Sequence, residues 1–433
     1  MTPIEMGWIT IGLLFILLII GMPIAFSLIA SAMVGIYFTR GSAGFEYVLA
    51  TMPYSYVANF AYVVVPLFMM MSCLAFAAGI SNRAFESAYK VTHGMRGGLA
   101  TASVFACAAF STVSGSSIAT ASSIARIAIP EMRAAGYSDR LAAGCIAAGG
   151  TLGVLIPPSG ILIIYSLATG TSVAQLFAGA LIPGVMTAIA YIIGITVMGY
   201  LRPNLVGGKP TSGLIPLSER IKSLFLMWEA FLLFAVVIGS IFLGIATPNE
   251  AAALGAFMAL GMLMFRKGRM RAVRDGLRET GTTTATVFGL IIGAGLFSVA
   301  LTTSQLPTEL ALMAASIDLP TNLMVLLILL PFLFLGAFID GFSMVLLTMP
   351  VVFPIIQQLG VDPILFGILV VKTVEIGLIT PPVGLNVFVV KGSVKDLALK
   401  DVFVGCIPFV FIELALILIL LFFPQIVLWP LGR

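Results

Sequence analysis

Apolar residues dominate the chain from end to end, in stretches of membrane-spanning length that are separated by short polar segments. A transmembrane helix needs about 20 predominantly apolar residues, so this pattern predicts an all-α polytopic membrane protein without a separate soluble domain. Residues 4–39 are expected to hold two spans that join at residues 21–23, and residues 61–80 a third. Further spans are expected at residues 141–168, 174–200, 224–245, 250–265, 282–303, 363–390 and 402–428.

The composition agrees with this pattern. Only 9% of the 433 residues are charged, and the mean hydropathy is +1.15. The N-terminal stretch lacks the basic region and the cleavage site of a signal peptide, so we interpret it as a retained span. With a single histidine, His93, and no nucleophile-elbow or phosphate-loop motif, the sequence does not indicate an enzyme. An intramembrane Ser/Lys hydrolase stays formally open.

Positive charges are concentrated in five clusters, which hold 19 of the 22 lysines and arginines. By the positive-inside rule, such clusters lie on the cytoplasmic side of a membrane. The parity of the expected spans then places both the N-terminus and the C-terminus outside. Membrane topology therefore accounts for the net charge of +4. Because the charge needs no acidic partner to explain it, nucleic acid is not an expected partner. The clusters lie at residues 83–96, 126–140, 202–222, 266–278 and 391–400.

A hairpin is expected between the first two basic clusters. Arg96 and Arg126 enclose 29 residues without charge, and both ends of this segment should be cytoplasmic. Two full crossings need roughly 40 residues, so the segment is too short for them. We therefore predict that residues 97–132 form a re-entrant hairpin, which enters from the cytoplasm and turns at residues 114–117.

Paired prolines interrupt two of the predicted helices, in GVLIPPSG at residues 153–160 and in GLITPPVG at residues 377–384. A proline inside a helix removes a backbone donor and clashes with the carbonyl one turn earlier. Each pair therefore predicts a broken helix, the first over residues 141–168 and the second over residues 363–390. A simple kink is the alternative for a single pair.

The two breaks belong to an internal repeat. Pro157 and Pro381 are 224 residues apart, and the same spacing separates Pro130 from Pro354. Residues 319–361 then correspond to the first hairpin, but they open to the outside, which predicts an inverted-topology repeat. Each arm of this second hairpin is long enough to span a bilayer, so two full crossings with the turn in the cytoplasm are the alternative.

Helices that end inside a membrane leave N–H groups at their starts and carbonyl groups at their ends without hydrogen-bond partners. Such groups can bind ions. Carbonyl groups near Gly153 and Gly377 are suited to a bare cation such as Na⁺. The half-helix N-termini after Ser116 and Gly341 carry partial positive charge and suit an anionic substrate. Lys372 and Glu375, three residues apart in the second broken helix, form either a structural ion pair or a transport element.

Five motifs together resemble the large membrane subunit (M subunit) of tripartite ATP-independent periplasmic (TRAP) transporters, over nearly the whole chain. This resemblance implies an elevator-type secondary transporter of the ion transporter superfamily, which imports organic anions such as C4-dicarboxylates or sialic acid with Na⁺ in a bacterial inner membrane. The motifs are AFSTVSGSSIATASSIA, GTLGVLIPPSGILIIY, ATPNEAAALG, LGAFIDGFSMVLLTMPVVFPI and GLITPPVGLNVFVV.

The resemblance also implies where the ions bind, because in this family each hairpin tip meets a broken helix at a Na⁺ site. Asp340 matches the family's acidic hairpin position, and Asp340 or Glu375 could couple protons instead. No cofactor is expected besides Na⁺ as the coupling ion. The expected residues are Ser114, Ser117, Gly153, Ile156 and Pro158 for the first sodium site; Gly341, Gly377, Thr380 and Val383 for the second; and Ser116, Ser159, Asp340, Ser343 and Asn386 for substrate binding or coupling.

Two partner proteins follow from the resemblance: a small four-helix membrane subunit (Q subunit) and a periplasmic substrate-binding protein (P protein). A single-component dicarboxylate carrier, coupled to Na⁺ or H⁺, is the alternative. The expected division is residues 1–96 as N-terminal scaffold helices, 97–170 as the first half of the transport domain, 171–280 as further scaffold helices and basic loops, 281–392 as the second half of the transport domain, and 393–433 as a C-terminal helix.

Overall fold

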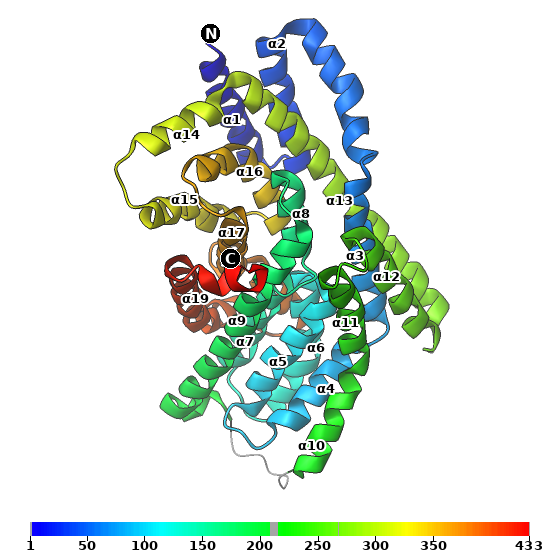
Figure 1. Ribbon diagram of the computed structural model, residues 1–433. Coiled ribbons are helices and arrows are strands. Elements are labelled where there is room, and N and C mark those ends of the chain that lie inside the picture. The colour runs from blue at the N-terminus through cyan, green and yellow to red at the C-terminus, as the bar shows by residue number, and fades with distance from the viewer. Residues whose placement is uncertain (1, 208–214, 267, 433) are drawn as a thin grey trace.

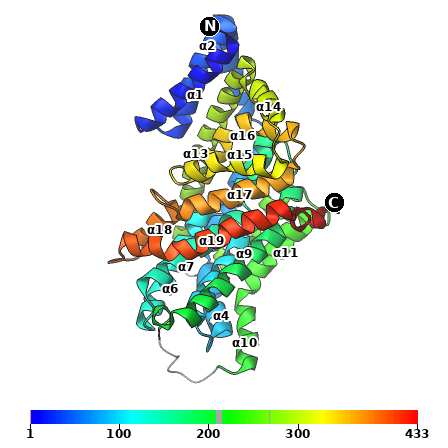
Figure 2. The same ribbon diagram turned by 90° about the vertical axis from the view of Figure 1, so that its left-hand side faces the viewer.

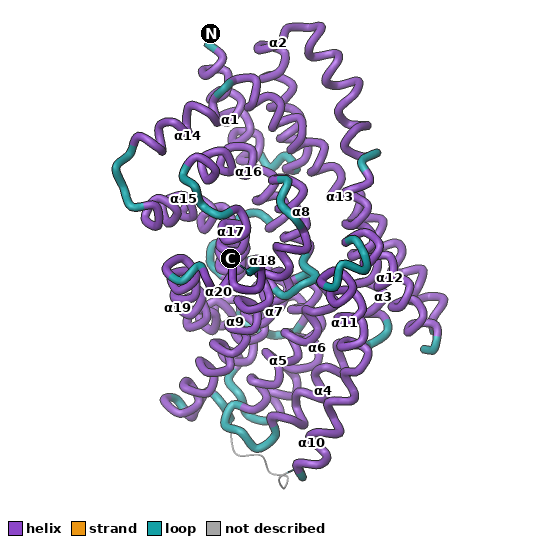
Figure 3. Tube along the Cα trace, in the orientation of Figure 1, coloured by secondary structure: helices purple, strands orange, loops and turns teal. Residues whose placement is uncertain are grey.

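The computed structural model describes residues 2–207, 215–266 and 268–432, and in this part of the chain it is helical without strands (Figure 3). Among these described residues, seven helices are long and apolar enough to cross a membrane, or eight if one bent pair is counted as a single span. The predicted all-α membrane fold is therefore confirmed. Lys209 and Lys267, which belong to two of the basic clusters, lie outside the described residues.

One group of helices forms a bundle at one side of the molecule. Its two longest members, α2 and α13, pack along each other and extend to the same end (Figure 1). The helix α12 packs on α3, and α1 packs on both α2 and α13. The helices are α1 (Pro3–Ile19), α2 (Ile24–Val57), α3 (Val64–Ala77), α11 (Trp228–Phe242), α12 (Pro248–Met264) and α13 (Arg269–Ser304).

Two helices of this bundle are longer than predicted. The expected break at residues 21–23 separates α1 from α2, but α2 continues beyond residue 39 to Val57, with a non-helical residue at Gly41. Likewise, α13 begins at Arg269 and not near residue 282. Arginine is a good helix former, and charged residues at a helix end that leaves the hydrocarbon do not terminate the helix.

The first predicted hairpin and broken helix are present in the order expected. The hairpin consists of α5 (Gly98–Ser114) and α6 (Ser117–Ala134), and its turn contains Gly115 at a positive φ of 58°. The broken helix consists of α7 (Asp139–Leu155) and α8 (Gly160–Thr169), which are bent by 41° at the proline pair.

The second half repeats this arrangement. Its hairpin consists of α15 (Thr321–Gly336) and α16 (Gly341–Gln358), and its broken helix of α17 (Pro363–Ile379) and α18 (Leu385–Ser393). The turn before α16 lies against the second break, because the amides of Val383 and Gly384 donate to the Ala337 carbonyl. The second hairpin therefore turns inside the molecule, as the re-entrant arrangement requires, and the inverted-repeat fold class is confirmed.

The remaining helices surround these two units. Two of them, α9 and α19, pack against both α7 and α17, and Figure 2 shows α9, α17 and α19 running beside one another. The amphipathic α4 packs against α5, and α14 packs against α16. The helices are α4 (Ile80–Thr92), α9 (Val173–Leu201), α10 (Leu217–Leu224), α14 (Leu306–Ser316), α19 (Leu399–Phe422) and α20 (Gln425–Leu428), with short 3-10 turns at Phe60–Val63, Pro203–Leu205, Phe225–Met227 and Trp429–Leu431.

Candidate functional site

The tip of the first hairpin lies directly on the first helix break. The Gly160 amide donates to the Gly115 carbonyl at 3.3 Å. A Cβ atom on Gly153 would lie 2.5 Å from the Ser116 carbonyl oxygen, so only glycine allows this approach. In an uninterrupted helix residue 157 would donate to the Gly153 carbonyl, but Pro157 has no N–H. The tip and the break thus bring backbone oxygens together.

All five residues predicted for the first sodium site gather here. Ser114 and Ser117 are buried at the tip, and Gly153, Ile156 and Pro158 are buried at the break. The Ser114 hydroxyl lies 2.7 Å from that of Thr120. No carboxylate is among the five, so a cation bound here would be held by neutral oxygens.

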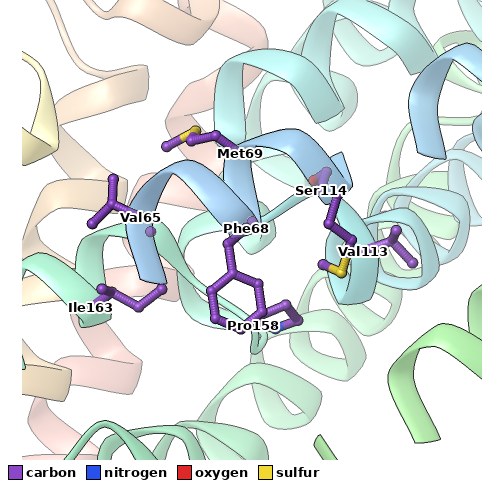
Figure 4. A pocket seen from close by; sticks show the side chains of 10 residues that line it. Val65, Phe68, Met69, Val113, Ser114, Pro158 and Ile163 are labelled. Carbon is purple, nitrogen blue, oxygen red and sulfur yellow. The ribbon is translucent and has the colours of Figure 1, made fainter. Parts of the chain in front are cut away.

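A helix of the neighbouring bundle covers this site. Ser72 of α3 donates to the Ser114 carbonyl at 2.5 Å, and Figure 4 shows Phe68 of α3 extending toward Pro158. The cavity between α3, the tip and the break measures about 10 Å³, which is room for about one water molecule. Ser72 was not predicted; its only signal in the sequence is a serine within an apolar span.

The second tip meets the second break in a similar way. The Ala337 carbonyl accepts hydrogen bonds from the Val383 and Gly384 amides at 3.2 and 3.3 Å. A Cβ atom on Gly336 would lie 3.4 Å from the Cα of Gly377. Ala337 was not predicted because only the fold brings its carbonyl to the break.

The residues predicted for the second sodium site are spread more widely. Gly377, Thr380 and Val383 lie at the break, and the Thr380 hydroxyl donates to the Ile376 carbonyl at 2.6 Å. Gly341 instead begins α16, where it packs between Ile161 of α8 and Val374 of α17. The structure thus brings three of the four residues together and places Gly341 between the two halves.

The two breaks differ in their exposure to the surroundings. Pro157 and Pro158 are buried, whereas Pro381 and Pro382 are exposed. The sequence repeat predicts two equivalent sites, but the packing of α3 over the first break makes them unequal.

Two half-helix N-termini converge between the halves. A Cβ atom on Gly160, at the start of α8, would lie 2.9 Å from the ring of Phe342, the second residue of α16. At α16 the amides of Phe342 and Ser343 donate to the Asp340 carboxylate, whereas at α8 the neutral hydroxyl of Ser159 caps the Leu162 amide. The partial positive charge at the start of α8 therefore has no acidic cap to offset it, and it favours an anionic group nearby.

Four of the residues predicted for substrate binding or coupling lie at helix starts. Three of them are N-cap residues, and the fourth, Ser343, contacts the N-cap residue Asp340. Ser116 and Ser159 are N-cap residues, and their hydroxyls accept from the amides of Ala119 and Leu162, each at 3.3 Å. Asp340 is the N-cap of α16: Oδ1 accepts from the Ser343 amide at 3.1 Å, and the Ser343 hydroxyl donates to Oδ2 at 2.5 Å. These oxygens therefore stabilise the helix starts.

Asn386 contacts the first broken helix. It is fully buried on α18, and its Nδ2 donates to the Ala147 carbonyl of α7 at 3.2 Å. Its Oδ1 has no hydrogen-bond partner among the described residues. Asn386 thus links the two broken helices.

Asp340→Asn separates a capping role from a charge-dependent role, because asparagine caps helices about as well as aspartate. We expect the variant to keep wild-type thermal stability, whereas Asp340→Ala should lose about 1 kcal/mol of unfolding free energy. Thermal unfolding of the two purified variants checks this prediction. An equal loss of stability in both would contradict it and would show that the carboxylate charge itself stabilises the hairpin.

A buried charge cluster lies between α17, α9 and α19. Lys372 Nζ lies 2.7 Å from Glu375 Oε2, donates to the Thr187 hydroxyl at 2.8 Å and forms an ion pair with Glu413. The Tyr191 hydroxyl donates to Glu413. All three charged side chains are fully buried. The predicted Lys372–Glu375 pair is present, and Glu413 was missed although it is a lone acid in an apolar span.

Comparison with known proteins decides the family. A family model described as "Tripartite ATP-independent periplasmic transporter, DctM component" matches residues 11–426. The chain belongs to this DctM family. It is 34% identical over 430 residues to a sialic acid TRAP transporter large permease protein of Vibrio cholerae, covering 98% of this chain and 96% of that protein. It is 32% identical over 445 residues to a C4-dicarboxylate TRAP transporter large permease protein of the same species, covering 97% of each.

A solved structure supports the fold of this DctM-family chain. The structure of the Alcanivorax borkumensis YdaH transporter superposes with a TM-score of 0.64 at 17% sequence identity, covering 90% of this chain and 91% of that one. At this identity the likeness concerns the fold alone. The family shows that the protein is a TRAP large permease and a multi-pass membrane protein, and its relatives are transporter permeases.

Proposed function

We propose that this TRAP large permease is a sodium-coupled secondary importer of an organic anion of the C4-dicarboxylate or sialic-acid type. It works in the bacterial inner membrane with a small four-helix membrane subunit and a periplasmic substrate-binding protein. The observation that carries the proposal is the contact of each hairpin tip with its own helix break, at Gly115 and Gly160 in one half and at Ala337 and Val383 in the other.

Sodium coupling is supported by the chemistry of these contacts. At the first break the available groups are carbonyl and hydroxyl oxygens, including those of Ser114 and Ser117. At the second they include the carbonyl of Gly377 and the side chain of Thr380. Na⁺ takes neutral oxygen ligands of this kind, and in related transporter folds unwound backbone and half-helix ends coordinate it.

Binding of an anion is supported by the N-terminus of α8 at Gly160, which lies between the two halves beside Phe342 and has a neutral cap, Ser159. Carboxylate oxygens of a substrate would accept hydrogen bonds from amides and from a hydroxyl such as that of Ser116, whereas the buried Ser159 hydroxyl already donates to the Val154 carbonyl. The printed names of the two relatives, for sialic acid and for C4-dicarboxylates, agree with an organic anion.

An elevator mechanism is supported by the arrangement of the helices in two groups (Figure 1). One group is the bundle of α1, α2, α3, α11, α12 and α13, and the other consists of the helices around the two breaks. In the proposal residues 97–170 and 318–392 move against the bundle, whereas residues 281–304 stay with it as part of α13. Both termini face the periplasm. The unequal exposure of the proline pairs agrees with one of two alternating states.

Reconstitution in liposomes tests the proposal. We expect purified large and small subunits to accumulate labelled sialic acid or succinate only with the cognate binding protein and an inward Na⁺ gradient. A K⁺ gradient of equal size and omission of the binding protein are the controls. Uptake that persists without the binding protein would support a single-component carrier, and uptake that persists in K⁺ would overturn sodium coupling.

A further inference from the structure

A large cavity opens between the start of α7, the end of α9 and residues 404–411 of α19, at the end of α7 that is away from the first helix break. Its volume is about 460 Å³, which is within the range of small-molecule sites. It is lined by Arg140 near the start of α7 and by Arg202 at the C-terminal cap of α9. These two residues belong to the basic clusters that the positive-inside rule places at the cytoplasmic face.

The charges of this cavity are not balanced. The Arg140 side chain is 57% exposed, and its Nε donates to Asp401 Oδ1 at 2.8 Å. The Arg202 side chain is exposed and has no ion-pair or hydrogen-bond partner among the described residues. Both arginines line the cavity, but within the described part of the chain only Arg140 is paired with a carboxylate. The Arg202 donors are therefore free to bind an anion such as a phosphate.

The cavity changes from basic to apolar along α19. Asp401, the ion-pair partner of Arg140, lies at the start of α19, whereas Ile407 and Phe411 line the cavity further along this helix. At 1.5 Å per residue, Phe411 lies about 15 Å from Asp401 along the helix axis. The side chains of Ile407 and Phe411 are 50% and 67% exposed, and that of Leu201 on α9 is 76% exposed. A charged end and an apolar end at this spacing match a phospholipid with its headgroup at the membrane surface.

We propose that this cavity binds an anionic phospholipid. The headgroup phosphate contacts Arg202 and Arg140, and an acyl chain lies along Ile407 and Phe411. Basic pockets between transmembrane helices on the cytoplasmic side bind anionic lipid headgroups in this way. The bound lipid would join α9 to α7 and α19. Its assignment to the inner leaflet rests on the proposed orientation of the chain, but the binding itself does not.

Lipid titration of the purified protein in neutral detergent tests the proposal, with native mass spectrometry as the readout. We expect phosphatidylglycerol to bind and phosphatidylcholine to bind far more weakly. Arg202→Gln should weaken phosphatidylglycerol binding about five-fold, as should Arg140→Gln, because each basic residue near a membrane contributes about 1 kcal/mol. Arg202→Gln is the decisive variant, since it breaks no ion pair.

Matched controls keep the test specific. Arg271→Gln removes a cytoplasmic arginine that is 92% exposed on α13, away from the cavity, and should leave lipid binding unchanged. Arg202→Lys should retain part of the binding because the charge remains. Phosphatidylglycerol binding that survives in the Arg140→Gln/Arg202→Gln double variant would overturn the proposal, as would equal binding of phosphatidylcholine. Glycerol 1-phosphate is the soluble counterpart of the headgroup. If it bound as tightly as phosphatidylglycerol, the cavity would be a site for soluble anions, and the lipid assignment would be overturned.

Discussion

Lys372→Met is expected to lower the free energy of unfolding by about 3–5 kcal/mol, because removing one partner of a buried ion pair leaves the others uncompensated. Lys372 is the ammonium group that faces both Glu375 and Glu413, and all three side chains are fully buried. Methionine keeps a similar length and apolar stem, so the loss would come from the charge and not from a cavity.

Thermal unfolding of the purified variant measures this effect, with Lys391→Met as the matched control. Lys391 is exposed on the neighbouring helix α18, and its replacement should change the stability by no more than about 0.5 kcal/mol. The triple variant Lys372→Met/Glu375→Gln/Glu413→Gln should recover part of the loss. If Lys372→Met were as stable as the control, the cluster would not hold α17, α9 and α19 together.

The helix breaks were predictable from the sequence because proline and glycine act on their own backbone. The pairs at Pro157 and Pro381 end α7 and α17 close to the expected residues. Their equal spacing from Pro130 and Pro354 revealed the repeat without any knowledge of the packing. By contrast, the start of α13 at Arg269 was missed, since a change from charged to apolar residues does not by itself end a helix.

The contacts of the site were only partly predictable. The tip and break residues of the first site came together as expected, because both lie in the same repeat unit. Ser72, Ala337 and Glu413 were missed, since their roles depend on segments that meet only in the folded chain. The unequal burial of the two proline pairs also depends on α3, which packs on the first break. The positions of prolines and glycines in the sequence do not reveal this contact. The division into transport domain and scaffold and the residues assigned to Na⁺ stay predictions.

Gly153→Ala is expected to abolish the Na⁺-specific stabilisation that the first site would provide. A Cβ atom at this position would lie 2.5 Å from the Ser116 carbonyl oxygen and 2.7 Å from its carbon, so the hairpin tip must move away from the break. Overpacking of this kind costs about 1–3 kcal/mol. It also separates Ser114 and Ser117 from the carbonyls of the break, and a cation held by both sides would lose half of its ligands.

Unfolding of the variant in NaCl and in KCl at equal ionic strength separates these two effects. In the wild type a ligand at a hundredfold excess over its Kd stabilises the folded state by about 2.7 kcal/mol. Gly153→Ala should lose this Na⁺-dependent difference as well as some stability in KCl. Gly261→Ala is the control, since no atom lies within 4 Å of its added Cβ on α12 and alanine favours a helix. A Gly153→Ala protein that keeps the full Na⁺ difference would place the cation away from the first tip and break, and the second break would then be the site to test.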